Sequence, residues 1–101
     1  MKHQELSEYI IGTLKEPERC RQYLDGAFED YEVDGDYAGL LLAVRRVAEA
    51  RMRIDANQGI KNSEIDRVLA IVSSKQAPSF DQLLSTVRIL GWRLSLVELA
   101  S

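Results

Sequence analysis

The segment from Gly59 to Leu69 constrains the fold more than any other part of the chain. Gly59 is followed at once by an apolar residue, and further apolar residues stand six and nine positions after it, at Ile65 and Val68. Glycine accepts backbone conformations that a side chain resists, and apolar residues at helical spacing seat a helix on its neighbour. The pattern therefore predicts a helix, a turn and a second helix, which together form a helix-turn-helix motif.

The polar residues of this segment are predicted to lie on the outward face of the second helix. In a helix-turn-helix protein that face enters the major groove of DNA. We expect Asn62 and Ser63 to reach base edges, while Lys61 and Arg67 meet a guanine edge or a phosphate. Three flanking basic residues are candidates for contacts with the DNA backbone: Arg51, Arg53 and Lys75. Each arginine could instead lie on a solvated face or form an ion pair. The whole pattern could also belong to a helical protein that does not bind DNA.

Apolar residues at helical spacing run through most of the chain and predict a single all-α domain over residues 1–101. Its parts are an acidic helical region (1–36), a helix-turn-helix core (37–91) and a C-terminal strand (92–99). Five to six helices are expected, at 5–14, 17–31, 37–50, 52–58, 62–73 and 80–90. Asp36 is placed to cap the third helix, Ser79 and Gln82 match a capping box, and Gly91 suits a helix end.

The same spacing predicts which side chains face the core. In the first helix the apolar side is expected to include Leu6 and Tyr9, together with Ile10 and Leu14. Phe80 is expected to point inward from the last helix. Arg46 lies off the apolar stripe of the third helix and is expected to point to solvent.

Apolar and polar residues alternate after Gly91. Trp92, Leu94 and Leu96 alternate with Arg93 and Ser95, a period of two that is typical of a strand. An unpaired strand edge favours pairing with another copy, so we expect a homodimer in which two such strands meet across a two-fold axis. The alternative is an extended tail that lies flat on the helices.

Charge divides the chain into two regions. Residues 1–36 carry four basic and ten acidic side chains, net −6, whereas residues 37–101 carry nine and six, net +3. An uneven split can arise by chance in a short helical protein. It also fits two surfaces with different partners, a basic one for phosphate and an acidic one for a basic protein.

Composition indicates a protein without catalytic chemistry. The single cysteine, Cys20, cannot form an internal disulfide, which agrees with a reducing cytoplasm. No metal-ligand spacing or phosphate-binding glycine loop is present, and the longest apolar run, 40–44, is too short to span a bilayer. We therefore expect a cytoplasmic protein that is not an enzyme, uses no cofactor or metal and does not bind a membrane.

Motifs over residues 8–97 carry a resemblance to a known family. The strongest lie near the end of the chain: Pro78-Ser79-Phe80, Leu83-Leu84 and Ile89-Leu90-Gly91-Trp92-Arg93-Leu94-Ser95-Leu96. A similar lead-in precedes them: Tyr23-Leu24, Ala27-Phe28 and the run from Leu40 to Arg51. These motifs resemble the addiction-module antidote family, the small helix-turn-helix antitoxins of bacterial toxin-antitoxin pairs. The resemblance implies a lambda-repressor-like fold and a DNA-binding antitoxin that represses its own operon and neutralises a RelE/HigB-like toxin.

The chain departs from the family pattern where DNA would bind. Asp55 stands four residues before the turn glycine, where the family usually has alanine, and Lys61 stands where serine or threonine usually caps the second helix. Glu64 and Asp66 put negative charge near the phosphates. Two alternatives therefore stay open: a helix-turn-helix transcription regulator without a toxin, and a protein-interaction module with a degenerate motif.

Overall fold

The computed structural model describes residues 3–99 and contains, over that range, five helices and no strand. The helices are α1 (His3–Thr13), α2 (Pro17–Asp34), α3 (Tyr37–Asn57), α4 (Ser63–Val72) and α5 (Phe80–Ile89). This agrees with the predicted all-α class. The predicted domain also includes residues 1, 2, 100 and 101, which lie outside the described residues.

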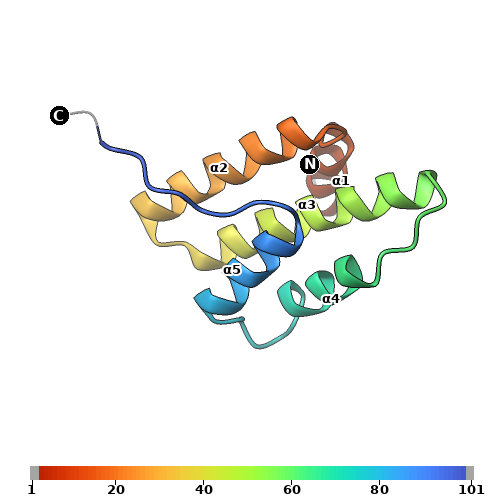
Figure 1. The fold of residues 1–101 in the computed structure, drawn as a ribbon. Coiled ribbons are helices and arrows are strands. Elements are labelled where there is room, and N and C mark those ends of the chain that lie inside the picture. Colours follow the sequence, from red (N-terminus) through yellow and green to blue (C-terminus); the bar gives the residue numbers. More distant parts are fainter. Residues whose placement is uncertain (1–2, 100–101) are drawn as a thin grey trace.

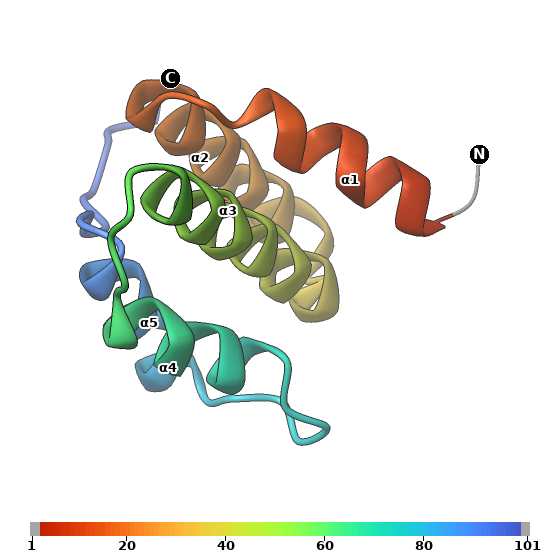
Figure 2. The same cartoon turned by 90° about the vertical axis from the view of Figure 1, so that its right-hand side faces the viewer.

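The other helices are arranged around α3 (Figure 1). It contacts α1, α2 and α4, and α4 in turn contacts α5. In Figure 2, α2 and α3 lie side by side, with α1 crossing near one end of the pair and α4 and α5 on the opposite side. Because it has neighbours on several sides, α3 contributes more buried residues than any other helix.

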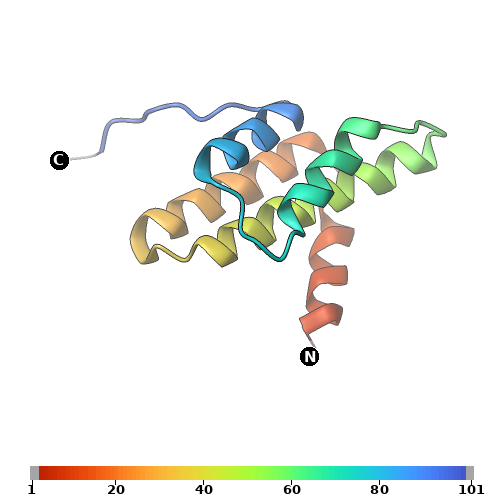
Figure 3. The same cartoon turned by 90° about the horizontal axis from the view of Figure 1, so that it is seen from below.

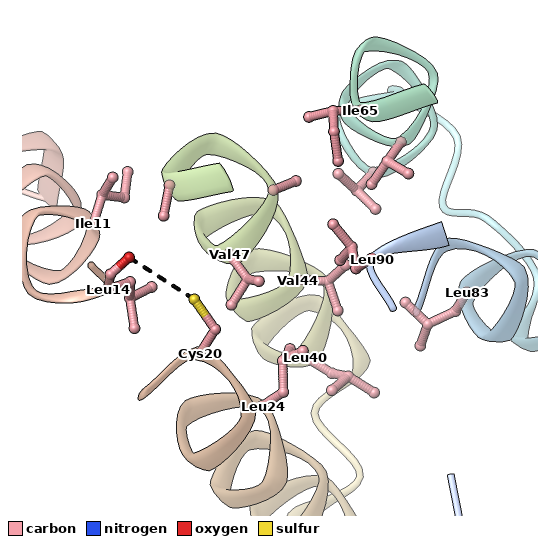
Figure 4. Close-up of a cluster of buried hydrophobic side chains, with 14 residues drawn as sticks. Ile11, Leu14, Cys20, Leu24, Leu40, Val44, Val47, Ile65, Leu83 and Leu90 are labelled. Atoms are coloured by element: carbon pink, nitrogen blue, oxygen red, sulfur yellow. Dashed lines mark hydrogen bonds between the residues drawn. The ribbon is translucent and has the colours of Figure 1, made fainter. Parts of the chain in front are cut away.

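The core lies where α3 meets its neighbours (Figure 4). Leu40, Val44 and Val47 of α3 are almost completely buried, and they belong to one cluster with Leu24 of α2 and Leu90 at the end of α5. Cys20 belongs to the same cluster, and its thiol donates to the carbonyl oxygen of Leu14 at 3.8 Å. The apolar stripe predicted for α3 is therefore confirmed.

The predicted caps explain where the helices begin and end. The side chain of Asp36 accepts a hydrogen bond from the N–H of Gly39 at the start of α3. Ser79 and Gln82 form both bonds of the capping box at the start of α5. Gly91 follows α5 with a φ of 104°, a left-handed conformation that favours glycine.

One helix replaces the two that were predicted between residues 37 and 58. α3 continues to Asn57 without a break, so the separate helix at 52–58 is wrong. Arg51 is a good helix former, and no glycine or proline interrupts residues 40–57. Nothing in the local chemistry therefore ends the helix before Gly59.

The predicted faces of three helices need correction. Leu6 and Tyr9 are 41% and 66% exposed, because α1 turns Ser7 and Ile11 inward instead. Arg46, expected in solvent, is only 8% exposed, because its guanidinium meets hydroxyl groups from α1 and α2. Phe80 is 43% exposed, since it stands at the first position of α5 rather than on its buried stripe.

Residues 92–99 leave the helices as an extended tail (Figure 3). The N–H of Trp92 bonds to the carbonyl of Val87, but no later residue of the described tail makes a backbone hydrogen bond. Trp92 is half-buried against the core, but Leu96 and Leu99 are 103% and 90% exposed, so the apolar side chains of the outer tail have no cover in the single chain. The tail does not pack flat on the helices, and the predicted strand is not formed in one copy.

Candidate nucleic-acid interface

The turn before α4 is built by Gly59. Gly59 has a φ of 74°, and the N–H of Ile60 reaches back to the carbonyl oxygen of Asp55 at 2.8 Å. The N–H of Gly59 bonds to the carbonyl of Ala56, which completes a Schellman motif at the end of α3. A side chain at position 59 would strain this turn, so the glycine determines where the chain leaves α3 and turns toward α4.

The apolar side of α4 holds its polar side outward. Ile65 and Val68 are 2% and 0% exposed, and Val72 continues the same buried stripe. Truncating a buried isoleucine such as Ile65 to alanine costs about 2–5 kcal/mol, so the orientation of α4 is firmly set. Every residue predicted to contact DNA in this segment is exposed: Lys61, Asn62, Ser63 and Arg67.

Asn62 has a structural role at the start of α4. Its Oδ1 accepts a hydrogen bond from the N–H of Glu64 at 3.0 Å, so Asn62 rather than Lys61 is the N-cap. The amide nitrogen of Asn62 remains available to donate to a base acceptor. Sequence reasoning gave Asn62 only a base-reading role, although asparagine is among the preferred N-cap residues.

The electrostatics of this face are balanced rather than basic. Lys61 and Arg67 are accompanied by Glu64 and Asp66, both in the first turn of α4. The two carboxylates favour the helix because they lie near its positive end. They also oppose a phosphate that approaches the same end, so this surface has little general attraction for nucleic acid.

The flanking basic residues are dispersed rather than gathered around α4. Arg51 donates to the carbonyl oxygen of Leu90 at 3.0 Å and its guanidinium carbon lies 5.7 Å from the ring centre of Trp92, so it ties α3 to the end of α5. Arg53 forms an ion pair of 2.8 Å with Glu8 of α1. Lys75 is exposed in the loop after α4, beyond the end opposite Lys61.

The course of α4 differs from that of a typical second helix of the motif. α4 returns along the second half of α3 in Figures 1 and 3, as in a helical hairpin. The helices of a helix-turn-helix usually cross at about 90–120°.

A buried polar cluster that sequence reasoning missed joins three helices. Arg46 donates from Nε and Nη2 to the hydroxyl of Ser7 at 3.1 and 2.9 Å, and from Nη1 to the hydroxyl of Tyr23 at 3.0 Å. The partners are neutral, so the cation is solvated by hydroxyl groups. No local signal predicts this cluster, because its members lie up to 39 residues apart in the sequence.

The described residues were also compared with the requirements of a metal site, a nucleophilic cysteine and a membrane span. They contain no group of three or more histidine, cysteine or acidic side chains arranged to hold a metal ion. Burial raises the pKa of the Cys20 thiol, which opposes formation of a nucleophilic thiolate. None of the described helices combines the length and apolar character needed to cross a membrane.

Comparison with known proteins adds no relative. No protein-family model matches the chain, and no curated protein or solved structure is significantly similar to it. The addiction-module resemblance therefore stays a prediction from short motifs. The function has to be inferred from the surface of this chain.

Proposed function

We propose that the chain is a cytoplasmic, DNA-binding antitoxin that represses its own operon and neutralises a RelE/HigB-like toxin. The observation that carries the proposal is the outward polar face of α4, held in place by the buried side chains of Ile65 and Val68. In this proposal the motif is of the helix-turn-helix type, and its first helix is the C-terminal end of α3 rather than a separate helix. The acidic part of the molecule serves the toxin.

DNA contacts would come from the start and the middle of α4. Ser63 and the amide nitrogen of Asn62 are suited to acceptors on base edges. Lys61 and Arg67 are suited to guanine or phosphate, and no salt bridge within residues 5–99 engages either. The balanced charge of α4 favours recognition of a particular sequence over general attraction to DNA.

A homodimer would supply the second half of the interface. The exposed apolar tail, 92–99, has free backbone groups that can pair with the same tail of a second copy. A C-terminal strand would then form between copies. Two α4 helices about 34 Å apart would read a palindromic operator one helical turn long.

A second candidate function is protein interaction through a degenerate motif. Two observations favour it: α4 returns along α3 as a hairpin, and Glu64 and Asp66 oppose phosphate at the end of α4. In that case the exposed face of α4 would contact another protein. A transcription regulator without a toxin would use the same DNA contacts as the antitoxin.

Titration against the DNA upstream of the gene separates these functions. We expect Arg67→Ala to weaken specific binding about ten-fold or more and to reduce the salt slope by about one. Arg19→Ala is the matched control, since it removes the same charge from an exposed position on α2. Unchanged affinity and slope for Arg67→Ala would remove that residue from the interface.

Two further results would decide between the candidates. No binding of the wild-type chain to its own upstream DNA at low salt would leave only the interaction module. Specific DNA binding without co-purification of a small basic protein encoded beside the gene would favour a regulator without a toxin.

A further inference from the structure

An open groove runs between α2 and the first half of α3. It has a volume of about 400 Å³ and is lined only by residues of these two helices and the turn between them. Its walls include small or apolar residues, and its acidic residues lie toward the end where α2 turns into α3: Gly26, Ala27, Leu40, Ala43, Asp30 and Asp34. No other helix contributes to this groove.

Gly26 has no evident purpose in the isolated chain. It lies well inside α2, where glycine is about 1 kcal/mol less favourable than alanine. A Cβ built on Gly26 meets no atom within 4 Å outside its own stretch of helix, and its φ is not positive. Alanine would therefore fit and stabilise the helix. A glycine at such a position is favourable where another chain approaches the backbone closely.

The carboxylates that line the groove, Asp30, Asp34 and Asp36, form no salt bridge within residues 5–99, although Asp34 and Asp36 each accept a backbone hydrogen bond. Residues 22–44 contain six carboxylates and neither lysine nor arginine. Asp30 and Asp34 stand one helical turn apart on α2, a spacing at which like charges are destabilising. The salt bridges within residues 5–99 engage Glu8, Glu18 and Glu49, and none reaches these six carboxylates. Both the glycine and the charges would become favourable if a cationic partner occupied the groove.

We propose that the α2–α3 groove binds a cationic helical segment of the partner toxin. The lining residues of α2 run from Gln22 to Asp34, about 18 Å of helix, which matches three turns of a partner helix. The small side chains of Gly26, Ala27 and Ala43 allow close helix packing. Lysine or arginine on the sides of the partner helix would meet Asp30 and Asp34. DNA is not a suitable occupant, because its phosphates would be repelled.

This inference deepens the proposed function and rests on it for the identity of the partner as a toxin. The probe is an 18-residue synthetic helical peptide of alanine, leucine and lysine, and a peptide with glutamate in place of lysine is its control. On the full chain labelled with ¹⁵N, we expect the amide signals of Gly26 and Gly39 to shift on adding the lysine peptide. The signals of Gly59 and Gly91 should not move.

Substitution tests the groove directly. Gly26→Leu places a side chain in the groove at a position where a Cβ meets no atom within 4 Å. We expect it to weaken peptide binding at least ten-fold while the fold, followed by circular dichroism, is retained. Gly12→Leu is the matched control, because a Cβ on Gly12 also meets nothing within 4 Å and Gly12 lies on α1, away from this groove. Asp30→Asn should weaken binding by a smaller factor.

Three results would overturn the inference: equal peptide affinity for Gly26→Leu and wild type, shifts spread over glycines far from the groove, or equal binding of the glutamate peptide. Absence of binding at low salt would overturn it as well. Failure of the proposed function is seen separately, in the DNA titration. If the chain binds the peptide in the groove but not its upstream DNA, the DNA-binding function is refuted and the groove as a binding site is retained. If the chain binds its upstream DNA but not the peptide, only the groove inference is refuted.

Discussion

Replacing Ser7 by alanine tests the buried polar cluster that fastens α1 to α3. The Ser7 hydroxyl accepts two of the three hydrogen bonds that the Arg46 guanidinium makes, at 3.1 and 2.9 Å. Both residues are less than one tenth exposed, at 7% for Ser7 and 8% for Arg46. Without the hydroxyl, the Nε–H and one Nη2–H of a buried cation lose their acceptor, and water has little access to replace it.

The expected loss follows from the cost of such unpaired groups. A hydrogen bond to a charged group contributes about 1.5–3 kcal/mol, and the two bonds share one acceptor, so they are not counted twice. We expect Ser7→Ala to lower the free energy of unfolding by about 2 kcal/mol. For a chain of this size that corresponds to a fall in melting temperature of about 8–16 °C.

A double-mutant cycle shows whether the loss comes from Arg46. Arg46→Met keeps an apolar stem of similar shape and removes the donors, and the Ser7 hydroxyl can then bond to a carbonyl of its own helix. In that background Ser7→Ala should cost less than about 0.5 kcal/mol, measured by urea unfolding. The reasoning would be refuted if the melting temperature of Ser7→Ala lay within 2 °C of wild type, which corresponds to a loss of unfolding free energy on the order of 0.5 kcal/mol or less. It would also be refuted if Ser7→Ala cost the same in both backgrounds.

Two further predictions concern the half-buried Tyr37 and the buried Cys20, which lie away from the candidate surfaces. The Tyr37 hydroxyl donates to the carbonyl oxygen of Pro78 at 2.8 Å, so Tyr37→Phe should lower the free energy of unfolding by about 1 kcal/mol in thermal melts; an unchanged melt would mean that solvent satisfies this carbonyl. The Cys20 thiol is fully buried and its pKa is raised by burial, so a thiol reagent at neutral pH should label it only when the chain unfolds. Labelling of the native protein as fast as free cysteine would contradict its burial.

The starts of α3 and α5 and the end of α5 could be predicted because caps depend on atoms a few residues apart. Asp36 binds the N–H of Gly39, and Ser79 and Gln82 bind each other's backbone groups. Gly91 closes α5 by the same local chemistry. The position of the turn at Gly59 and the outward face of α4 followed from local spacing in the same way.

The inward faces of α1 and α3 depended on contacts that local spacing does not contain. In α1 the stripe through Leu6 and Tyr9 and the stripe through Ser7 and Ile11 both have helical spacing, and the bond between Ser7 and Arg46, 39 residues apart, accompanies the second. The predicted break near Arg51 had no local cause either. It came from the usual form of the motif, whereas the sequence itself lacks a helix breaker there.

The continuity of α3 determines how the two candidate surfaces relate to each other. Ala43 lines the α2–α3 groove in the first half of this helix, and Gly59 makes the turn to α4 just past its C-terminal end. From Ala43 to the last residue of α3, Asn57, the helix is about 21 Å long. Because α3 has no break at Arg51, α4 cannot swing toward the groove as it could on a separate short helix. A partner in the groove would therefore leave the polar face of α4 uncovered, so we expect any effect of that partner on DNA binding to act through the arrangement of the two copies rather than by direct competition for α4.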